Sequence, residues 1–121
     1  EPLINLLSHE NKDARQSAAT LLGKLGDARA IRPLIAALSD KDEDVRDEAA
    51  NVLGKLGYRQ AVQPLIALLA DTNWPVRKSA AVALGKLGDS QAIKPLTALM
   101  NDDIPVVRAA AVSALKMLEQ G

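Results

Sequence analysis

The chain has 121 residues, 15 basic and 15 acidic side chains, one His and no Cys. This length predicts one compact domain, and 48% apolar residues with only 2% aromatic residues predict a core of Leu, Ile, Val and Ala. Zero net charge argues against nucleic acid and anionic membranes as partners, and the lack of Cys excludes disulfides, thiolate metal sites and cysteine nucleophiles.

A repeat of 31 residues runs through the whole chain. Prolines recur at Pro2, Pro33, Pro64 and Pro95, and arginines recur at Arg15, Arg46, Arg77 and Arg108. The copies are residues 1–27, 28–58, 59–89 and 90–121, and the first copy lacks its four opening positions. We expect residues 1–121 to form a single repeat domain, and the missing positions suggest that the sequence begins inside a longer array.

Each copy contains two stretches in which apolar residues recur at helical spacing. In chain order the expected helices are 28–39, 43–56, 59–70, 74–87, 90–101 and 105–119. One helix pair cannot bury its apolar faces alone, so neighbouring pairs must stack. The predicted fold is all-α, a right-handed α-solenoid of about four stacked helix pairs.

The prolines Pro33, Pro64 and Pro95 fall inside the expected first helix of each pair, where a proline disrupts hydrogen bonding. Either the helix bends there, or the residues before the proline form a separate tight turn and the proline opens the helix. The segment Gly-Lys-Leu-Gly ends the second helices at 23–26, 54–57 and 85–88. Its last glycine fits a left-handed helix end, and its first glycine is expected to allow close contact with the next repeat. A phosphate-loop interpretation lacks the required loop before a helix.

The motif A-[IV]-x-P-L-[IT], followed by V-R-x-x-A-A-x-x-L-G-K-L-G, recurs along the chain. It resembles the HEAT-like repeats of the short class found in phycobilin lyases. The resemblance implies a concave face lined by the second helices. It also implies an Asp/Arg ladder between repeats, and such a partner would explain arginines at helix starts, where the dipole disfavours a cation. The ladder residues would be Arg15, Asp40, Arg46, Asp71, Arg77, Asp102 and Arg108. His9 replaces the Asp in the first copy, where a rung would be missing.

Exposed positions that differ between copies are the candidates for specific binding. On the second helices they include a basic ridge (Lys24, Lys55 and Lys86), an acidic patch in the second repeat (Glu43, Asp44, Asp47 and Glu48) and an apolar end in the last repeat. The predicted partner-binding residues are Gln16, Thr20, Lys24, Asp47, Asn51, Lys55, Trp74, Lys78, Val82, Lys86, Ser113 and Met117.

Trp74 is the one Trp of the chain, at a position held by Lys12, Glu43 and Pro105 in the other copies. It is either an interface hot spot or local packing over Pro75, and the sequence does not decide between these interpretations. Tyr58, where other copies have Asp, is interpreted as an ordinary surface residue. In the last copy Lys116 and Glu119 replace the two glycines, which indicates the end of the stack.

One His and no Cys leave no catalytic or metal-ligating constellation, so we expect no enzyme and no cofactor. The predicted function is a non-enzymatic scaffold or interaction module in the cytoplasm, which binds a protein or peptide segment on the concave face. Neither nucleic acid nor membrane is expected as a partner, and self-association through the repeat ends is open. The alternative, implied by the resemblance, is part of a phycobilin lyase or a chaperone-like chromophore transferase.

Overall fold

The computed structural model describes residues 2–120, and all regular structure in this range is helical. The second helix of each pair is long: these are α2 (Lys12–Leu25), α4 (Glu43–Leu56), α6 (Trp74–Leu87) and α8 (Pro105–Gln120). The first helices are short: these are α1 (Pro2–Asn5), α3 (Ile31–Ala37), α5 (Val62–Leu68) and α7 (Ile93–Leu99).

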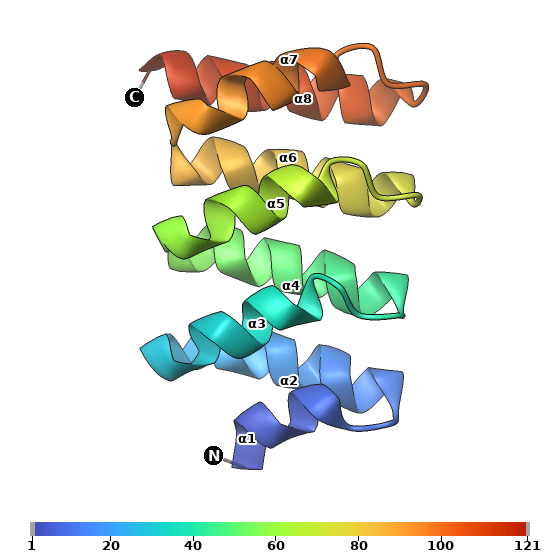
Figure 1. Ribbon diagram of the computed structural model, residues 1–121, viewed down its shortest axis with the longest axis vertical. Helices are drawn as coiled ribbons and strands as arrows, with labels where there is room; N and C mark the ends of the chain where they lie inside the picture. Colours follow the sequence, from blue (N-terminus) through green and yellow to red (C-terminus); the bar gives the residue numbers. More distant parts are fainter. Residues whose placement is uncertain (1, 121) are drawn as a thin grey trace.

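The helix pairs stack in chain order into two layers, one of α1, α3, α5 and α7 and one of α2, α4, α6 and α8 (Figure 1). Each second helix packs on the second helix of the next pair, so the long helices run side by side through the stack. The predicted all-α solenoid is confirmed. We call the exposed side of α2, α4, α6 and α8 the second-helix face.

The last three short helices are shorter than predicted, and each is preceded by a separate 3₁₀ turn, which is the second of the two alternatives considered for the prolines. These turns are Ala28–Ala30, Arg59–Ala61 and Ser90–Ala92. In the first of them the Asp27 side chain accepts a hydrogen bond from Arg29 N at 2.9 Å, which starts the turn. Pro33 then lies within the first turn of α3, where a backbone N–H would have no partner inside the helix. The proline therefore opens the helix and does not bend it.

The two glycines of each Gly-Lys-Leu-Gly segment have different structural roles: the last one ends the helix, and the first one lies against the next repeat. Gly57 ends α4 in the left-handed region at φ 75°, and Gly26 and Gly88 end α2 and α6 in the same way. A Cβ on Gly54 would lie 2.8 Å from the Cβ of Ala83 in the next repeat, so α4 and α6 approach closely only because Gly54 has no side chain. Glu119 replaces the left-handed glycine in the last repeat, and α8 continues to Gln120.

The core runs between the layers through all the repeats as one connected set of aliphatic side chains. Its largest fully buried members are Leu34, Leu53, Leu65, Leu84, Leu96, Val45, Val76 and Val107. Within residues 2–120, no helix is both long enough and apolar enough to cross a membrane.

Candidate functional site

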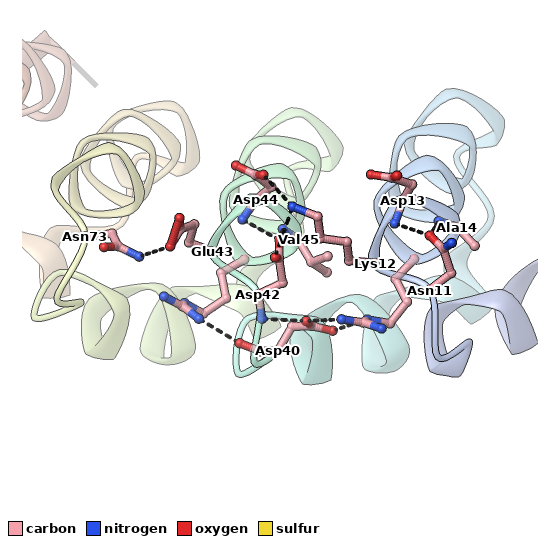
Figure 2. Close-up of polar contacts among 12 residues, drawn as sticks. Asn11, Lys12, Asp13, Ala14, Asp40, Asp42, Glu43, Asp44, Val45 and Asn73 are labelled. Atoms are coloured by element: carbon pink, nitrogen blue, oxygen red, sulfur yellow. Dashed lines mark hydrogen bonds and ion pairs between the residues drawn. The ribbon is translucent and has the colours of Figure 1, made fainter.

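The arginines at the start of the second helices form ion pairs from each repeat to the next. The rungs of this ladder are Arg15–Asp40, Arg46–Asp71 and Arg77–Asp102, each with 2.8 Å between Nε and a carboxylate oxygen. The guanidinium also donates from Nη1 to the loop of its own repeat, for example Arg46 to the Asp40 carbonyl at 2.8 Å. Figure 2 shows Asp40 contacted in both ways, through its carboxylate and its carbonyl. These contacts offset the unfavourable position of a cation at a helix start.

The open rung lies at the opposite end from the one the sequence suggested. Arg15 has its carboxylate partner, because each arginine reaches forward to the Asp of the following repeat. Arg108 has no such carboxylate among the described residues and donates to the carbonyls of Asp102 and Asp103. His9 takes over the loop contact of the missing Asp, since its Nδ1 accepts from Asn11 N at 3.0 Å as Asp40 accepts from Asp42 N at 2.9 Å.

The start of α6 differs from the starts of α2 and α4. Asn11 and Asp42 cap their helices by accepting hydrogen bonds from the backbone of the first turn. Asn73 occupies the same position before α6 but caps nothing, because Pro75, two residues on, has no N–H to donate. Its Nδ2 instead donates to Glu43 Oε1 at 2.8 Å, across the junction between α4 and α6 (Figure 2).

A pocket of about 250 Å³ lies at this junction, on the second-helix face. One wall is the first turns of α4 and the other is the start of α6. Trp74 is 42% exposed, an unusual exposure for the largest apolar side chain of the chain. The lining residues are Glu43, Asp44, Asp47, Thr72, Asn73, Trp74, Pro75 and Val76. Trp74 is therefore accessible from solvent, and its role as an interface hot spot stays a prediction.

Three carboxylates line the pocket, and none of its lining residues is basic. Lys12 approaches from α2, with its Nζ 3.6 Å from Asp42 and 3.7 Å from Asp44 (Figure 2). That lysine is shared between the two carboxylates and half-exposed, so it compensates them weakly. Asp47 accepts a hydrogen bond from Ser79 Oγ.

The pKa of Asp47 lies above its ordinary value because burial disfavours the charged form. The Ser79 hydrogen bond and Lys78 oppose this shift, and the neighbouring charges of Glu48 and Asp44 add to it. Asp102 in the ladder behaves in the opposite way, because hydrogen bonds from Arg77 lower its pKa. Asp102 is therefore well compensated by Arg77, whereas the pocket holds negative charge that Lys12 and Lys78 balance only in part.

The structure brings together only part of the predicted binding set. Trp74 and Asp47 line the pocket, and Lys78 lies close enough to act on the Asp47 charge. Thr20 is joined to Glu48 by a 2.6 Å hydrogen bond between α2 and α4. The remaining predicted residues lie on the second helices outside the pocket: Gln16, Lys24, Asn51, Lys55, Val82, Lys86, Ser113 and Met117.

The basic ridge of Lys24, Lys55 and Lys86 lies in the last turns of α2, α4 and α6. All three side chains are exposed, and none pairs with another of the described residues. The second-helix face is therefore bipolar, with negative charge where α4 begins and positive charge where the helices end. From Asp44 to Lys55 the helix rises about 16 Å.

The sequence did not single out Asn73, Thr72 or Glu43 as members of one site. The spacing of 31 residues that makes Glu43 and Trp74 equivalent was a usable signal, because equivalent residues of stacked helices lie side by side. Among the described residues, no group of three or more His, Asp or Glu is arranged to hold a metal ion.

The two ends of the stack do not match one another. Leu21 holds the position of Val52, Ala83 and Ala114, which face the preceding repeat, and it is 47% exposed. At the other end Lys116 replaces the glycine that admits a following repeat. Val112 replaces an alanine that is fully buried in the three earlier copies, and it is 39% exposed. Both ends therefore combine apolar surface with side chains larger than those at the internal junctions.

The family model of HEAT repeats matches residues 1–72 and 31–116. The chain belongs to the HEAT repeat family. No curated protein sequence matches this HEAT repeat chain significantly. The resemblance noted from the sequence is thus confirmed at the level of the family, which the 31-residue period and the Asp/Arg ladder also support.

Three solved structures are similar in fold to this chain. Human deoxyhypusine hydroxylase, in complex with glycerol, is 31% identical with a TM-score of 0.87, over 99% of this chain and 43% of that one. The complex of CpcE and CpcF of phycocyanin lyase from Nostoc sp. PCC7120 gives 26% identity and a TM-score of 0.71, over 98% of this chain and 64% of that one.

The third structure is a designed armadillo repeat protein in complex with the peptide (KR)4. It gives 23% identity and a TM-score of 0.78, over 97% of this chain and 63% of that one. This likeness shows the shared fold alone. The chain spans less than two thirds of the length of each of these proteins.

Proposed function

We propose that this HEAT repeat chain is a non-enzymatic protein-binding module whose partner lies on the second-helix face. The observation that carries the proposal is the pocket between α4 and α6, which an accessible Trp74 lines together with three carboxylates that Lys12 and Lys78 balance only in part. Exposed aromatic side chains beside a polar rim are typical of binding hot spots. Repeats conserve their stacking residues within the chain, so the differing residues of this face can carry specificity.

The charges of this face support a protein partner of mixed charge. The unpaired lysine ridge and the acidic pocket lie about 16 Å apart along α4. An extended segment covers that distance with about five residues at roughly 3.3 Å each. A polyanion such as nucleic acid would meet repulsion at the pocket, so the bipolar pattern favours a polypeptide.

Site-specific photo-crosslinking in lysate of the source cell tests this proposal. Asn51, in the middle of α4 on the second-helix face, is replaced by p-benzoylphenylalanine in one protein. Ala67, exposed on α5 in the other layer, is replaced in the matched control. We expect a protein adduct from position 51 that is absent from position 67. Adducts formed only at position 67 would overturn the assignment of the face.

A second experiment compares crosslinking from position 51 in the native background and in a triple variant that combines Trp74→Ala with Lys55→Glu and Lys86→Glu. These side chains are exposed, so helicity and the thermal melt should stay unchanged while the adduct from position 51 is lost. An undiminished adduct with this variant would place the binding energy elsewhere.

The alternative is that the chain is part of a phycobilin lyase or of a chaperone-like chromophore transferase. It is supported by the likeness in fold to the CpcE and CpcF complex at 26% identity. Visible absorbance of a bilin that binds to the purified chain would favour this alternative. Crosslinking to a protein without bilin absorbance would favour the interaction module.

A further inference from the structure

The pocket between α4 and α6 combines three properties that occur together at this one junction of second helices. Its volume of about 250 Å³ is below the roughly 300–1,000 Å³ of sites for drug-sized ligands, so it suits a single side chain. It offers an accessible indole on one wall and carboxylates on the other. It is lined by no basic residue.

The equivalent positions at the other junctions lack this combination. Between α2 and α4, Lys12 and Asp13 take the positions of Glu43 and Asp44, and no aromatic residue is present at the start of α4. Between α6 and α8, the wall on α6 carries Trp74 and Lys78 without a carboxylate, and α8 starts with Pro105. Stacking does not require the combination, because the other two junctions form without it.

The chemistry of the walls selects the occupant. A cation over an indole face is attracted to the ring, and a guanidinium both stacks on aromatic rings and donates in parallel to carboxylates. An anion would be repelled by Glu43, Asp44 and Asp47. The carboxylates do not converge on one point as metal ligands would, since no such cluster exists among the described residues.

We propose that this pocket seats the guanidinium of an arginine in an extended partner segment, with Trp74 stacked on it and the carboxylates of Asp44 and Asp47 accepting its hydrogen bonds. The inference rests on the proposed function and names the partner's chemistry at that site. The unfavourable burial of the Asp47 charge in the free protein agrees with it, since an arriving cation supplies the missing counter-charge.

The test uses the whole chain and three peptides that differ only in the end group of their long side chains. The probe is an acetylated, amidated decapeptide of alternating Gly and Arg. Its citrulline twin has the neutral isostere in place of every Arg, and its lysine twin has Lys in place of every Arg. Trp74 is the one Trp of the chain, so its fluorescence reports directly on the pocket, and calorimetry gives the affinity independently. We expect the arginine peptide to shift the Trp74 emission and to bind about tenfold or more tightly than the citrulline peptide.

Matched variants locate the contact. Asp44→Asn with Asp47→Asn removes two charges while keeping side-chain shape, and should weaken the arginine peptide about tenfold. Asp13→Asn removes one charge at the equivalent position of α2, outside the pocket, and should leave binding unchanged. Trp74→Leu should weaken binding measured by calorimetry.

Each contrary result has a defined meaning. No binding of the arginine peptide, or equal binding by its citrulline twin, would overturn the inference. Equal binding of a lysine twin would overturn the guanidinium assignment. If the pocket variants bind as the native chain does while position 51 still crosslinks to a partner, the pocket inference fails and the proposed function stands. Crosslinking at position 67 alone would overturn the proposed function itself.

Discussion

Arg46 of the second repeat holds Asp71 of the third through two parallel hydrogen bonds, Nε to Oδ2 at 2.8 Å and Nη2 to Oδ1 at 3.2 Å. Their side chains are only 14% and 9% exposed. Because the same guanidinium donates to the Asp40 carbonyl, one side chain joins a helix start, its own loop and the next repeat. We infer that the ladder fixes how successive repeats align.

Asp71→Ala should lower the free energy of unfolding by about 2–3 kcal/mol, because Arg46 would keep a charge in a largely buried place without its partner. Asp103→Ala is the matched control, since that side chain is exposed and outside the ladder. Urea denaturation measures the free energy of unfolding of both variants, and their m-values should stay unchanged. Equal midpoints for the two variants would show that the ladder contributes no stability.

Arginines of the same register should differ in their importance. Arg108 is exposed and lacks a carboxylate partner among the described residues, so Arg108→Ala should cost less than about 1 kcal/mol. Arg46→Ala should cost clearly more, since it also leaves Asp71 without its ion pair. Thermal melts rank the two variants, and a larger effect at Arg108 would be inconsistent with the forward direction of the rungs.

Gly54→Ala should destabilise the chain even though alanine is the better helix former. The new Cβ would lie 2.8 Å and 2.9 Å from the Cβ and Cα of Ala83, and a backbone atom cannot move aside by rotation. Overpacking of this kind costs about 1–3 kcal/mol, more than the roughly 1 kcal/mol gained in helix propensity. Gly85→Ala meets milder contacts, from 3.0 Å, and should cost less. A stabilised Gly54→Ala variant would refute the close approach of α4 and α6.

The two carboxylates with opposite pKa shifts predict opposite pH dependence. The pKa of Asp102 is lowered, mainly by Arg77, so its contribution to stability is present above its ordinary pKa of 3.8 and is lost as the pH falls. The pKa of Asp47 is raised, so its contribution is largest at low pH and is lost as the pH rises through the folded pKa. The neighbouring groups Asp44, Glu48, Lys78 and Ser79 should keep their positions in both variants.

Stability measured between about pH 3 and pH 6 separates the two cases. Relative to the native chain, Asp102→Asn should lose stability as the pH rises, whereas Asp47→Asn should gain. Parallel pH profiles for the two variants would contradict the assigned environments.

The ends of the stack predict that the 121-residue chain does not continue head to tail. If a second copy stacked on the last repeat, Lys116 would meet Leu21 of that copy, whereas each internal junction places a glycine against a valine or an alanine. Arg108 would meet His9 of that copy, whereas the arginines at internal junctions meet an aspartate. Light scattering after gel filtration should show monomers. The variant Lys116→Gly, Val112→Ala, Leu21→Ala and His9→Asp restores the internal pattern and should form open-ended oligomers that grow with concentration. Oligomers formed by the native chain, with none formed by the variant, would refute this prediction.

Periodicity predicted the long helices to the residue at 43–56 and 74–87, because the glycine that ends each helix repeats with the core pattern. The first helices were predicted too long, since Asp27 closes a 3₁₀ turn that the apolar spacing does not distinguish from an α-helix. The forward direction of the ladder could not be predicted, because it depends on how the pairs stack. The pocket was missed as a unit, since it depends on how α4 and α6 lie side by side and on the hydrogen bond from Asn73 to Glu43, which the repeat pattern does not show.

The most direct test of the second-helix face is chemical-shift mapping of the ¹⁵N-labelled chain during titration with the arginine decapeptide. We expect the largest shifts on the first turns of α4 and α6 and on the indole N–H of Trp74, with little change along α3, α5 and α7. Shifts concentrated on those short helices, or on the two ends of the stack, would contradict the claim that this face is the binding surface.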